Sequence, residues 1–300
     1  MLWSERASDV TDQNGLGVAV DSGGNVLVTG DFTGAMALGG CPLSKGGANS
    51  LFVVKLDPSG TCFWSKNAGD AGTQHGQAVA VDTAGNVVVV GSLSGAMNLA
   101  GCPLQKAGSP GLVIAKLDAS GACLWSKEAG GAVSGHALAV DAAGNILVTG
   151  IYDSAMDWGG CPLSKAGGTG FFVSKLDSSG ACLWSRRAKG NGSQDGRGVV
   201  ADQAGNVLVT GSFDTAPSPS SVSLPSAGAT DFFLVKLDAA GEYLWTHRAG
   251  GTSDDAGNRL AVDTGGYAPV TGTSHGQSDF GTGLLVSEGG SDIFVAKYAP

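Results

Sequence analysis

Short apolar segments alternate with polar turns along the whole chain. Residues 78–81 and 86–90 flank the sequence Asp82-Thr-Ala-Gly85. This is a type I turn with Asp at its first position and Gly where a positive φ is needed, so the segment predicts a hairpin. A second turn of the same chemistry, Asp177-Ser-Ser-Gly180, separates residues 171–176 from residues 181–184. The pattern therefore predicts a series of short β-hairpins.

The hairpins belong to a five-fold internal repeat. The repeat is marked by Trp3, Trp64, Trp125, Trp184 and Trp245, and by Asp21, Asp82, Asp141, Asp202 and Asp263. Each unit holds four strands that are apolar on both faces, as in Val26-Leu27-Val28, which is expected when each small sheet lies between two neighbours. The prediction is an all-β, five-bladed β-propeller that forms a single domain over residues 1–300.

The two ends of the sequence predict how the ring closes. The fifth unit stops at residues 294–300 without an Asp-x-x-Gly turn or a Trp strand, whereas Leu2-Trp3-Ser4 matches Leu124-Trp125-Ser126. We expect the N-terminal strand to complete the last blade, which would remove two exposed sheet edges. The alternative is that the five units are a fragment of a larger array.

Three segments carry a family resemblance. They are Gly-Asn-Val-Leu-Val-Thr-Gly at 24–30, Phe-Val-Val-Lys-Leu-Asp-Pro-Ser-Gly at 52–60 and Gly-Gly-Thr-Ser-Asp-Asp at 250–255. The sequence resembles the bacterial SBBP β-propeller repeat over essentially its whole length. The resemblance implies an exported or surface-associated protein, with no catalytic residue to carry over. The family's name refers to seven blades, whereas this sequence contains five units.

Composition narrows the choice of partners and location. The net charge is −9, and Arg186 with Arg187 form the one cluster of basic residues. Nucleic-acid binding depends on neutralising phosphates, so we expect no nucleic-acid partner.

Apolar runs are far shorter than the roughly 18 residues that cross a bilayer, which predicts no membrane insertion. The sequence opens without a signal peptide, so an exported protein would have lost its signal or carry it in a longer parent. We expect a monomer or part of a larger surface protein.

The six cysteines form pairs of equal spacing. Cys41 and Cys62, Cys102 and Cys123, and Cys161 and Cys182 each lie 21 residues apart within one unit. Units four and five lack both members of the pair, which indicates that the two cysteines of a unit act together. We predict three disulfides within the units, and hence a secreted or cell-surface protein. Reduced core thiols and a metal site are the alternatives.

Several apparent motifs are better explained by the repeat. Asp21-Ser22-Gly23-Gly24 resembles a serine-protease signature but is in register with the other turns, and Gly272-Thr-Ser-His-Gly276 resembles a nucleophile elbow but has no helix nearby. Trp158 aligns with apolar residues, so we expect it in the core. One lysine recurs in every unit, and we expect this set to be structural. The set is Lys55, Lys116, Lys175, Lys236 and Lys297. Calcium binding at the Asp-x-x-Gly turns is a weaker alternative.

Residues that determine ligand specificity should lie where equivalent positions of the five units carry different side chains. The loops before the first strand of each unit differ in this way, and they should surround one mouth of the central channel. The predicted ligand-binding residues are Asn14, His75, Gln77, His136, Asp195, Arg197, Asp255 and Asn258. Drift in unconstrained loops is the alternative.

The function expected from these residues is binding without catalysis. The first strands carry no acidic residue, which disfavours a glycosidase, and the four histidines have no metal-ligand spacing. We expect an extracellular binding module for a glycan or protein ligand, with no cofactor and no enzymatic activity. A passive spacer in a larger surface protein is the alternative.

Overall fold

The structure is a computed structural model of the chain. It describes residues 2–7, 11–44, 46, 48–68, 72–165, 168–187, 192–214 and 227–300, with the backbone alone for 105–110. These residues form β-strands and turns and include no helix, so the all-β prediction is confirmed. No helix long and apolar enough to cross a membrane was found in the described part.

Antiparallel strands follow one another in repeated sheets. Sheet one contains β1 (Gln13–Val20), β2 (Val26–Phe32), β5 (Ser50–Leu56) and β6 (Cys62–Ala68), with a small hairpin of β3 (Ala35–Leu38) and β4 (Cys41–Ser44). Sheet two contains β7 (Gly72–Val81), β8 (Val87–Leu99), β9 (Cys102–Leu117) and β10 (Cys123–Glu128). Sheet three contains β11 (Val133–Val140), β12 (Ile146–Tyr152), β13 (Gly170–Leu176) and β14 (Cys182–Arg187).

The last two sheets are joined. Sheet four contains β15 (Gln194–Ala201), β16 (Val207–Phe213), β17 (Asp231–Leu237) and β18 (Tyr243–Gly251). Sheet five contains β19 (Ala256–Leu260), β20 (Ala268–Asp279) and β21 (Leu284–Tyr298), and the end of β18 pairs with β20. Four strands per unit are thus observed in sheets one to four, and three in sheet five.

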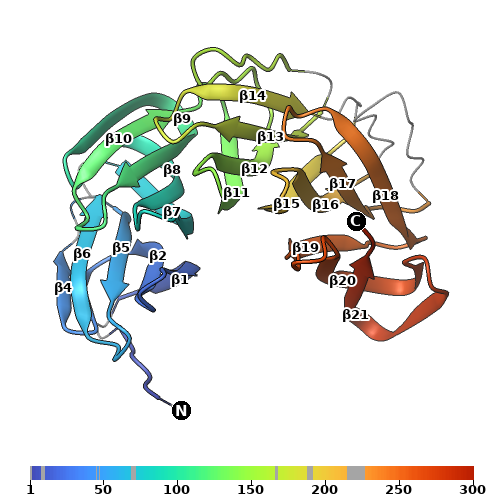
Figure 1. Cartoon of the computed structure of the whole chain (residues 1–300), viewed down its shortest axis with the longest axis horizontal. Coiled ribbons are helices and arrows are strands. Elements are labelled where there is room, and N and C mark those ends of the chain that lie inside the picture. The colour runs from blue at the N-terminus through green and yellow to red at the C-terminus, as the bar shows by residue number, and fades with distance from the viewer. Residues whose placement is uncertain are drawn as a thin grey trace.

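The sheets stand side by side in an arc, with the first strand of each sheet on the inside and β6, β10, β14 and β18 on the outside (Figure 1). Apolar side chains from neighbouring sheets form the cores between them. Leu51 and Val53 of sheet one, for example, share a buried cluster with Val79 and Val89 of sheet two. The apolar character of both faces of each strand follows from this sandwich arrangement.

The N-terminal segment does not complete sheet five in this structure. Residues 2–7 form no strand, and Leu2 is 98% exposed. Strand β21 pairs with β20, and the first and last sheets face each other across the opening of the arc (Figure 1). The expected closure of the ring by the N-terminal strand is therefore not seen.

The Asp-x-x-Gly turns form as predicted, and each turn Asp has a second role. In sheet two, Asp82 Oδ1 accepts hydrogen bonds from the backbone N–H of Ala84 and Asn86, and its Oδ2 lies 3.0 Å from the ammonium of Lys116. The same ion pair recurs in all five units, as Lys55–Asp21, Lys116–Asp82, Lys175–Asp141, Lys236–Asp202 and Lys297–Asp263. The five-fold lysines have a structural role, because each ammonium forms an ion pair with the turn carboxylate of its own unit.

These carboxylates predict how the fold responds to acid. Burial raises the pKa of Asp21, but hydrogen bonds from Asn25 and Lys55 outweigh it and lower the pKa from 3.8 to about 2. The pKa values of Asp82 and Asp141 are also lowered. A group with a depressed pKa in the folded state stabilises the protein above its unfolded pKa, and this contribution is lost as the pH falls through the folded value. Urea denaturation should show the free energy of unfolding decreasing between about pH 4 and about pH 2. A flat profile over this range would contradict the role given to the turns.

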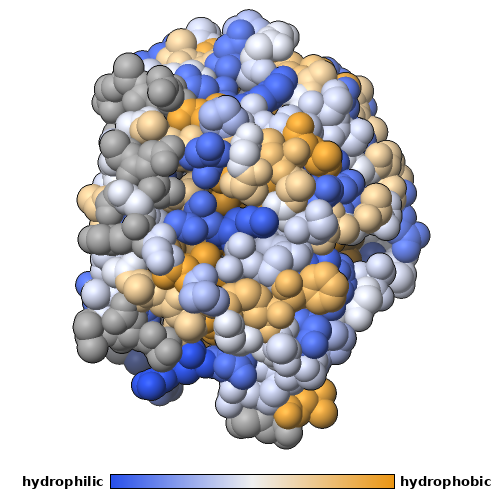
Figure 2. All heavy atoms as spheres, turned by 90° about the vertical axis from the view of Figure 1, so that its left-hand side faces the viewer, coloured by the Kyte–Doolittle hydropathy of each residue, from blue (hydrophilic) through white to orange (hydrophobic). Residues whose placement is uncertain are grey.

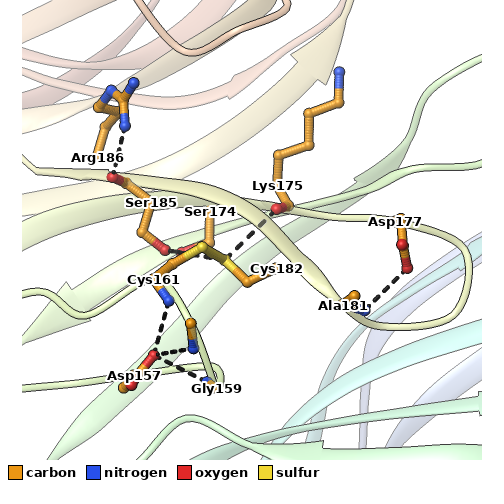
Figure 3. The surroundings of a disulfide bond; sticks show 11 residues. Asp157, Gly159, Cys161, Ser174, Lys175, Asp177, Ala181, Cys182, Ser185 and Arg186 are labelled. Atoms are coloured by element: carbon orange, nitrogen blue, oxygen red, sulfur yellow. Dashed lines mark hydrogen bonds between the residues drawn. A yellow bond between two sulfur atoms is a disulfide. The ribbon is translucent and has the colours of Figure 1, made fainter.

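All three predicted disulfides are present, as Cys41–Cys62, Cys102–Cys123 and Cys161–Cys182. Each joins a cysteine that follows the second strand of its unit, which in sheet two is Cys102 at the start of β9, to the start of the outermost strand. Figure 3 shows the third bond, where the Asp157 carboxylate accepts hydrogen bonds from the backbone of Gly159 and Cys161 and so fixes the loop that carries Cys161. Three disulfides are consistent with an extracellular protein.

The outer strands present mixed chemistry to solvent. Phe63 of β6 and Leu124 of β10 are 66% and 50% exposed. Seen from the side that carries these strands, apolar patches are interrupted by hydrophilic ones (Figure 2).

Trp158 is 2% exposed within the core between sheets two and three, so its predicted core position is confirmed. Gly272 and Ser274 lie within strand β20, which is not the strand-turn-helix geometry of a nucleophile elbow.

Candidate functional site: bulged residues at the inner strands

Each inner strand contains a β-bulge at the same position. In sheet three, Gly135 pairs with Gly150 and Ala137 pairs with Thr149, so His136 is an extra residue without a partner in the ladder. The same shift occurs in all five sheets. The extra residues are Leu16, Gln77, His136, Arg197 and Asn258. A bulge re-aims a side chain away from the regular alternation of its strand.

The repeat maintains this bulge with a glycine on the neighbouring strand. A side chain at Gly150 would collide with the backbone carbonyl of Ser134, and one at Gly211 would collide with that of Asp195. The scaffold therefore requires glycine opposite the bulge and leaves the bulged residue free to vary. This division explains why the residue after the conserved glycine of each inner strand differs from unit to unit.

The bulged side chains of sheets one to four meet in one pocket, which we call the axial pocket. Its lining residues are Leu16, Gln77, Gly135, His136, Asp195, Arg197 and Arg259. They come from β1, β7, β11, β15 and β19, the strands on the inside of the arc (Figure 1). Residues separated by more than 240 positions in the sequence are thereby brought together.

A chain of hydrogen bonds links the sheets around this pocket. His136 Nδ1 lies 2.7 Å from Asp195 Oδ1, and Arg197 Nε donates to Asp195 Oδ2 at 2.7 Å. Arg197 also donates through Nη1 to the Oδ1 atom of Asn258 at 3.1 Å. Four of the predicted residues from three different sheets are thus connected, with the Asp195 carboxylate at the centre of the chain.

The electrostatics of Asp195 depend on these partners. Burial raises its pKa, but hydrogen bonds from His136 and Arg197, together with their charges, outweigh burial and lower it. The carboxylate stays ionised near neutral pH and holds both side chains in place. The pocket thereby has fixed donors with a known orientation, which reduces the entropy that binding must overcome.

Arg259 is a pocket residue that was not predicted from the sequence. It is exposed, and its Nη1 atom donates to the backbone carbonyls of Arg197 and Asn258 at 2.9 and 2.8 Å. A signal was present, because Arg259 occupies the position where the other four units have Gly17, Ala78, Ala137 and Gly198. A charged residue at an otherwise small position indicates a local role.

Asn14 and His75 belong to a different cluster. Both contact Asp31, which is 3% exposed: Asn14 Nδ2 donates to Oδ1 at 3.0 Å, and His75 Nδ1 lies 2.8 Å from Oδ2. Asn49 donates to the same carboxylate at 3.2 Å. This cluster joins sheet one to sheet two and does not line the axial pocket.

Asp255 is buried rather than exposed on a loop. It is 0% exposed, and its carboxylate accepts hydrogen bonds from the Ser278 hydroxyl at 2.6 Å and from the Gly251 N–H at 2.8 Å. In this structure it fixes the start of β19 and is not accessible to a ligand. Asn258 does not line the axial pocket but accepts hydrogen bonds from two residues that do, Arg197 and Arg259.

Two further pockets lie between neighbouring sheets at equivalent positions. One includes Asp153 and Thr169 between sheets two and three, and the other includes Asp214 and Thr230 between sheets three and four. The second shares Asp195 and Arg197 with the axial pocket. The repeat therefore produces repeated pockets between sheets as well as the axial pocket. No group of three His, Cys, Asp or Glu residues suited to a metal ion occurs in the described part of the chain.

Comparisons with known proteins give distant relatives. No family model matches the sequence. An uncharacterized WD repeat-containing protein of Acanthamoeba polyphaga mimivirus is 22% identical over 236 residues, which cover 64% of this chain and 17% of that protein. The regulatory protein FlaEY of Caulobacter vibrioides is 28% identical over 151 residues, which cover 49% of this chain and 16% of FlaEY. The chain thus spans less than a fifth of either relative. The likeness to a WD repeat protein agrees with a fold of repeated antiparallel sheets.

Proposed function

We propose that the five sheets are consecutive blades of a β-propeller that acts as an extracellular binding module for a glycan or protein ligand. One observation carries the proposal: bulged residues that differ between the units converge on the axial pocket, while the residues common to all units build turns, ion pairs and cores. A propeller scaffold commonly binds ligands at the end of its axis, where variable loops surround a concave surface.

Binding fits the pocket better than catalysis does. His136 and Asp195 are arranged like a base and its orienting acid, but Arg197 shares the same carboxylate. The described lining residues include no Ser, Thr, Cys or Lys that could act as a nucleophile beside His136. The fixed donors suit recognition of polar groups, so we propose a non-enzymatic role for the axial pocket.

The proposal is tested by separating the axial pocket from the pockets between sheets. His136→Ala and Arg259→Ala change residues that line the axial pocket and neither of the two pockets between sheets, whereas Asp153→Ala changes a residue that lines a pocket between sheets and not the axial pocket. Ligands would first be identified on a glycan array and in a protein-binding screen with the unaltered chain.

The two axial variants should weaken binding by about tenfold or more, because each removes a charged or polar contact worth about 1.5–3 kcal/mol. Asp153→Ala and the exposed control Lys165→Ala should bind like the unaltered protein, as measured by calorimetry. If Asp153→Ala weakens binding and the axial variants do not, the repeated pockets carry the function. If no ligand binds, the chain is a passive spacer in a larger surface protein.

A further inference from the structure

The two end sheets of the arc expose surfaces that every internal sheet buries. Ile293 and Val295 of β21 are 84% and 73% exposed. The equivalent residues of sheet one, Leu51 and Val53, are 1% and 0% exposed because sheet two covers them. We call the surface around Ile293 and Val295 the fifth face. It has the apolar chemistry of an interface between sheets and has no sheet packed on it.

The opposite end shows the complementary surface. Val18 and Val20 of β1 are 69% and 62% exposed, whereas the equivalent Val79 of β7 is 6% exposed against sheet one. We call the surface around Val18 and Val20 the first face. In each internal interface, residues in the positions of the fifth face pack against residues in the positions of the first face. The two end surfaces are therefore the two halves of an interface that the chain already forms four times.

The ion pair of the last unit is exposed, unlike the equivalent pairs of the other units. Lys297 and Asp263 are 2.7 Å apart with side chains 56% and 39% exposed. In the other four units the same pair is between 3% and 9% exposed. Lys116 even donates to the carbonyl of Ser178 in the next sheet. A docked sheet would bury the last pair in the same way.

The N-terminal segment already lies where the outer strand of a preceding sheet would lie. Trp3 Nε1 donates to the carbonyl of Pro58 in the turn of sheet one at 3.0 Å. The tryptophans of β6, β10 and β14 make the same bond to the turn of the sheet that follows them, at 3.1, 3.2 and 3.0 Å. Residues 2–7 thus mark the outer strand of a sheet that would pack on the first face.

The fifth face of the same molecule does not reach this position. The four interfaces between sheets contain fully buried side chains, and closing the opening in Figure 1 would disturb this close packing. We propose instead that the fifth face of one copy docks on the first face of a second copy. Residues 2–7 of the second copy then pair with β21 of the first, with Trp3 opposite Lys297 as Trp64 is opposite Lys55.

This contact is head-to-tail, so each copy can use both faces and assembly can continue into a ring or filament. Sedimentation velocity of the full chain should show association that increases with protein concentration. Val18→Glu and Ile293→Glu should each weaken it by about tenfold or more, because each places a charge in an apolar interface. Both positions are largely exposed in one copy, so neither change affects a core. Leu124→Glu on the outer strand is the matched control and should associate normally.

A mixture of the two variants gives the sharper test. Val18→Glu retains an intact fifth face and Ile293→Glu an intact first face, so an equimolar mixture should form dimers that grow no further. A mixture that stays monomeric, or an unaltered chain that is monomeric at all concentrations, would overturn the proposal.

Crosslinking separates a second copy from closure within one chain. By the register of the other sheets, Ser4 should lie opposite Ala296, as Ser65 lies opposite Val54. Ser4→Cys and Ala296→Cys on separate copies should form a disulfide-linked dimer under oxidising conditions. If a chain carrying both substitutions instead forms the bond internally as a monomer, the fifth face is covered by its own first sheet and the proposal is wrong.

Discussion

Replacing Asp82 by Asn should destabilise the protein by about 3–5 kcal/mol, because it leaves the ammonium of Lys116 buried without an opposite charge. The two side chains are 7% and 4% exposed and lie 3.0 Å apart. A buried charge without its partner lowers the free energy of unfolding far more than replacing both members of the pair by apolar residues would. The free energy of unfolding would be measured by urea denaturation with two independent probes.

The repeat supplies a matched control for this substitution. Asp263 forms the same turn and the same ion pair in sheet five, where the pair is largely exposed. Asp263→Asn should therefore cost about 1 kcal/mol or less, since surface ion pairs contribute little. The loss of turn hydrogen bonds is common to both variants, so the difference between them isolates the effect of burial. Equal losses in the two variants would show that the turn, not the buried pair, provides the stability.

The elements that repeat could be predicted from the sequence because five copies of the same local chemistry constrain one another. The Asp-x-x-Gly turns fix where each hairpin reverses, and the joint presence of the cysteines selected the observed pairing. Trp158 was predicted to lie in the core because it aligns with apolar residues of the other units, and it is 2% exposed.

The curvature of the arc could not be predicted in this way. Whether five sheets meet depends on a small packing angle at each interface, and the side chains that set this angle lie far apart in the sequence. Trp3 was expected in a strand that completes sheet five, but residues 2–7 form no strand and Trp3 donates a hydrogen bond to the turn of sheet one. The sequence around Trp3 resembles the outer strands of the other units, but this local pattern does not determine which sheet the segment joins.

The candidate site was predicted in part, for a similar reason. The bulged residues Gln77, His136 and Arg197 were found because they vary at a fixed distance from a glycine. Asp255 was misplaced because a carboxylate was assumed to be exposed. It lies two residues before Gly257, as Gln74 lies two residues before Gly76, and both are buried. Alignment of that position across the units would have indicated burial.

Replacing Cys102 and Cys123 together by Ala should lower the free energy of unfolding by about 3 kcal/mol without changing the fold. The bond closes a loop with a sequence separation of 21, and cross-linking such a loop restricts the unfolded chain. Sheet four shows that the strands do not need the bond. β16, β17 and β18 pair in the same register as in the other units, although the sequence of unit four has no cysteine.

Reduction of the unaltered protein gives an independent measurement of the same effect. Urea denaturation with a thiol reductant should move the midpoint to a lower concentration, while circular dichroism in the absence of urea should keep the signal of a β protein. Peptide mapping without reduction should recover Cys102 linked to Cys123, and likewise the other two pairs. The double substitution should make the protein less sensitive to reductant by the contribution of one bond. A midpoint that reduction leaves unchanged, or free thiols in protein isolated from an oxidising compartment, would show that the bonds do not stabilise the sheets.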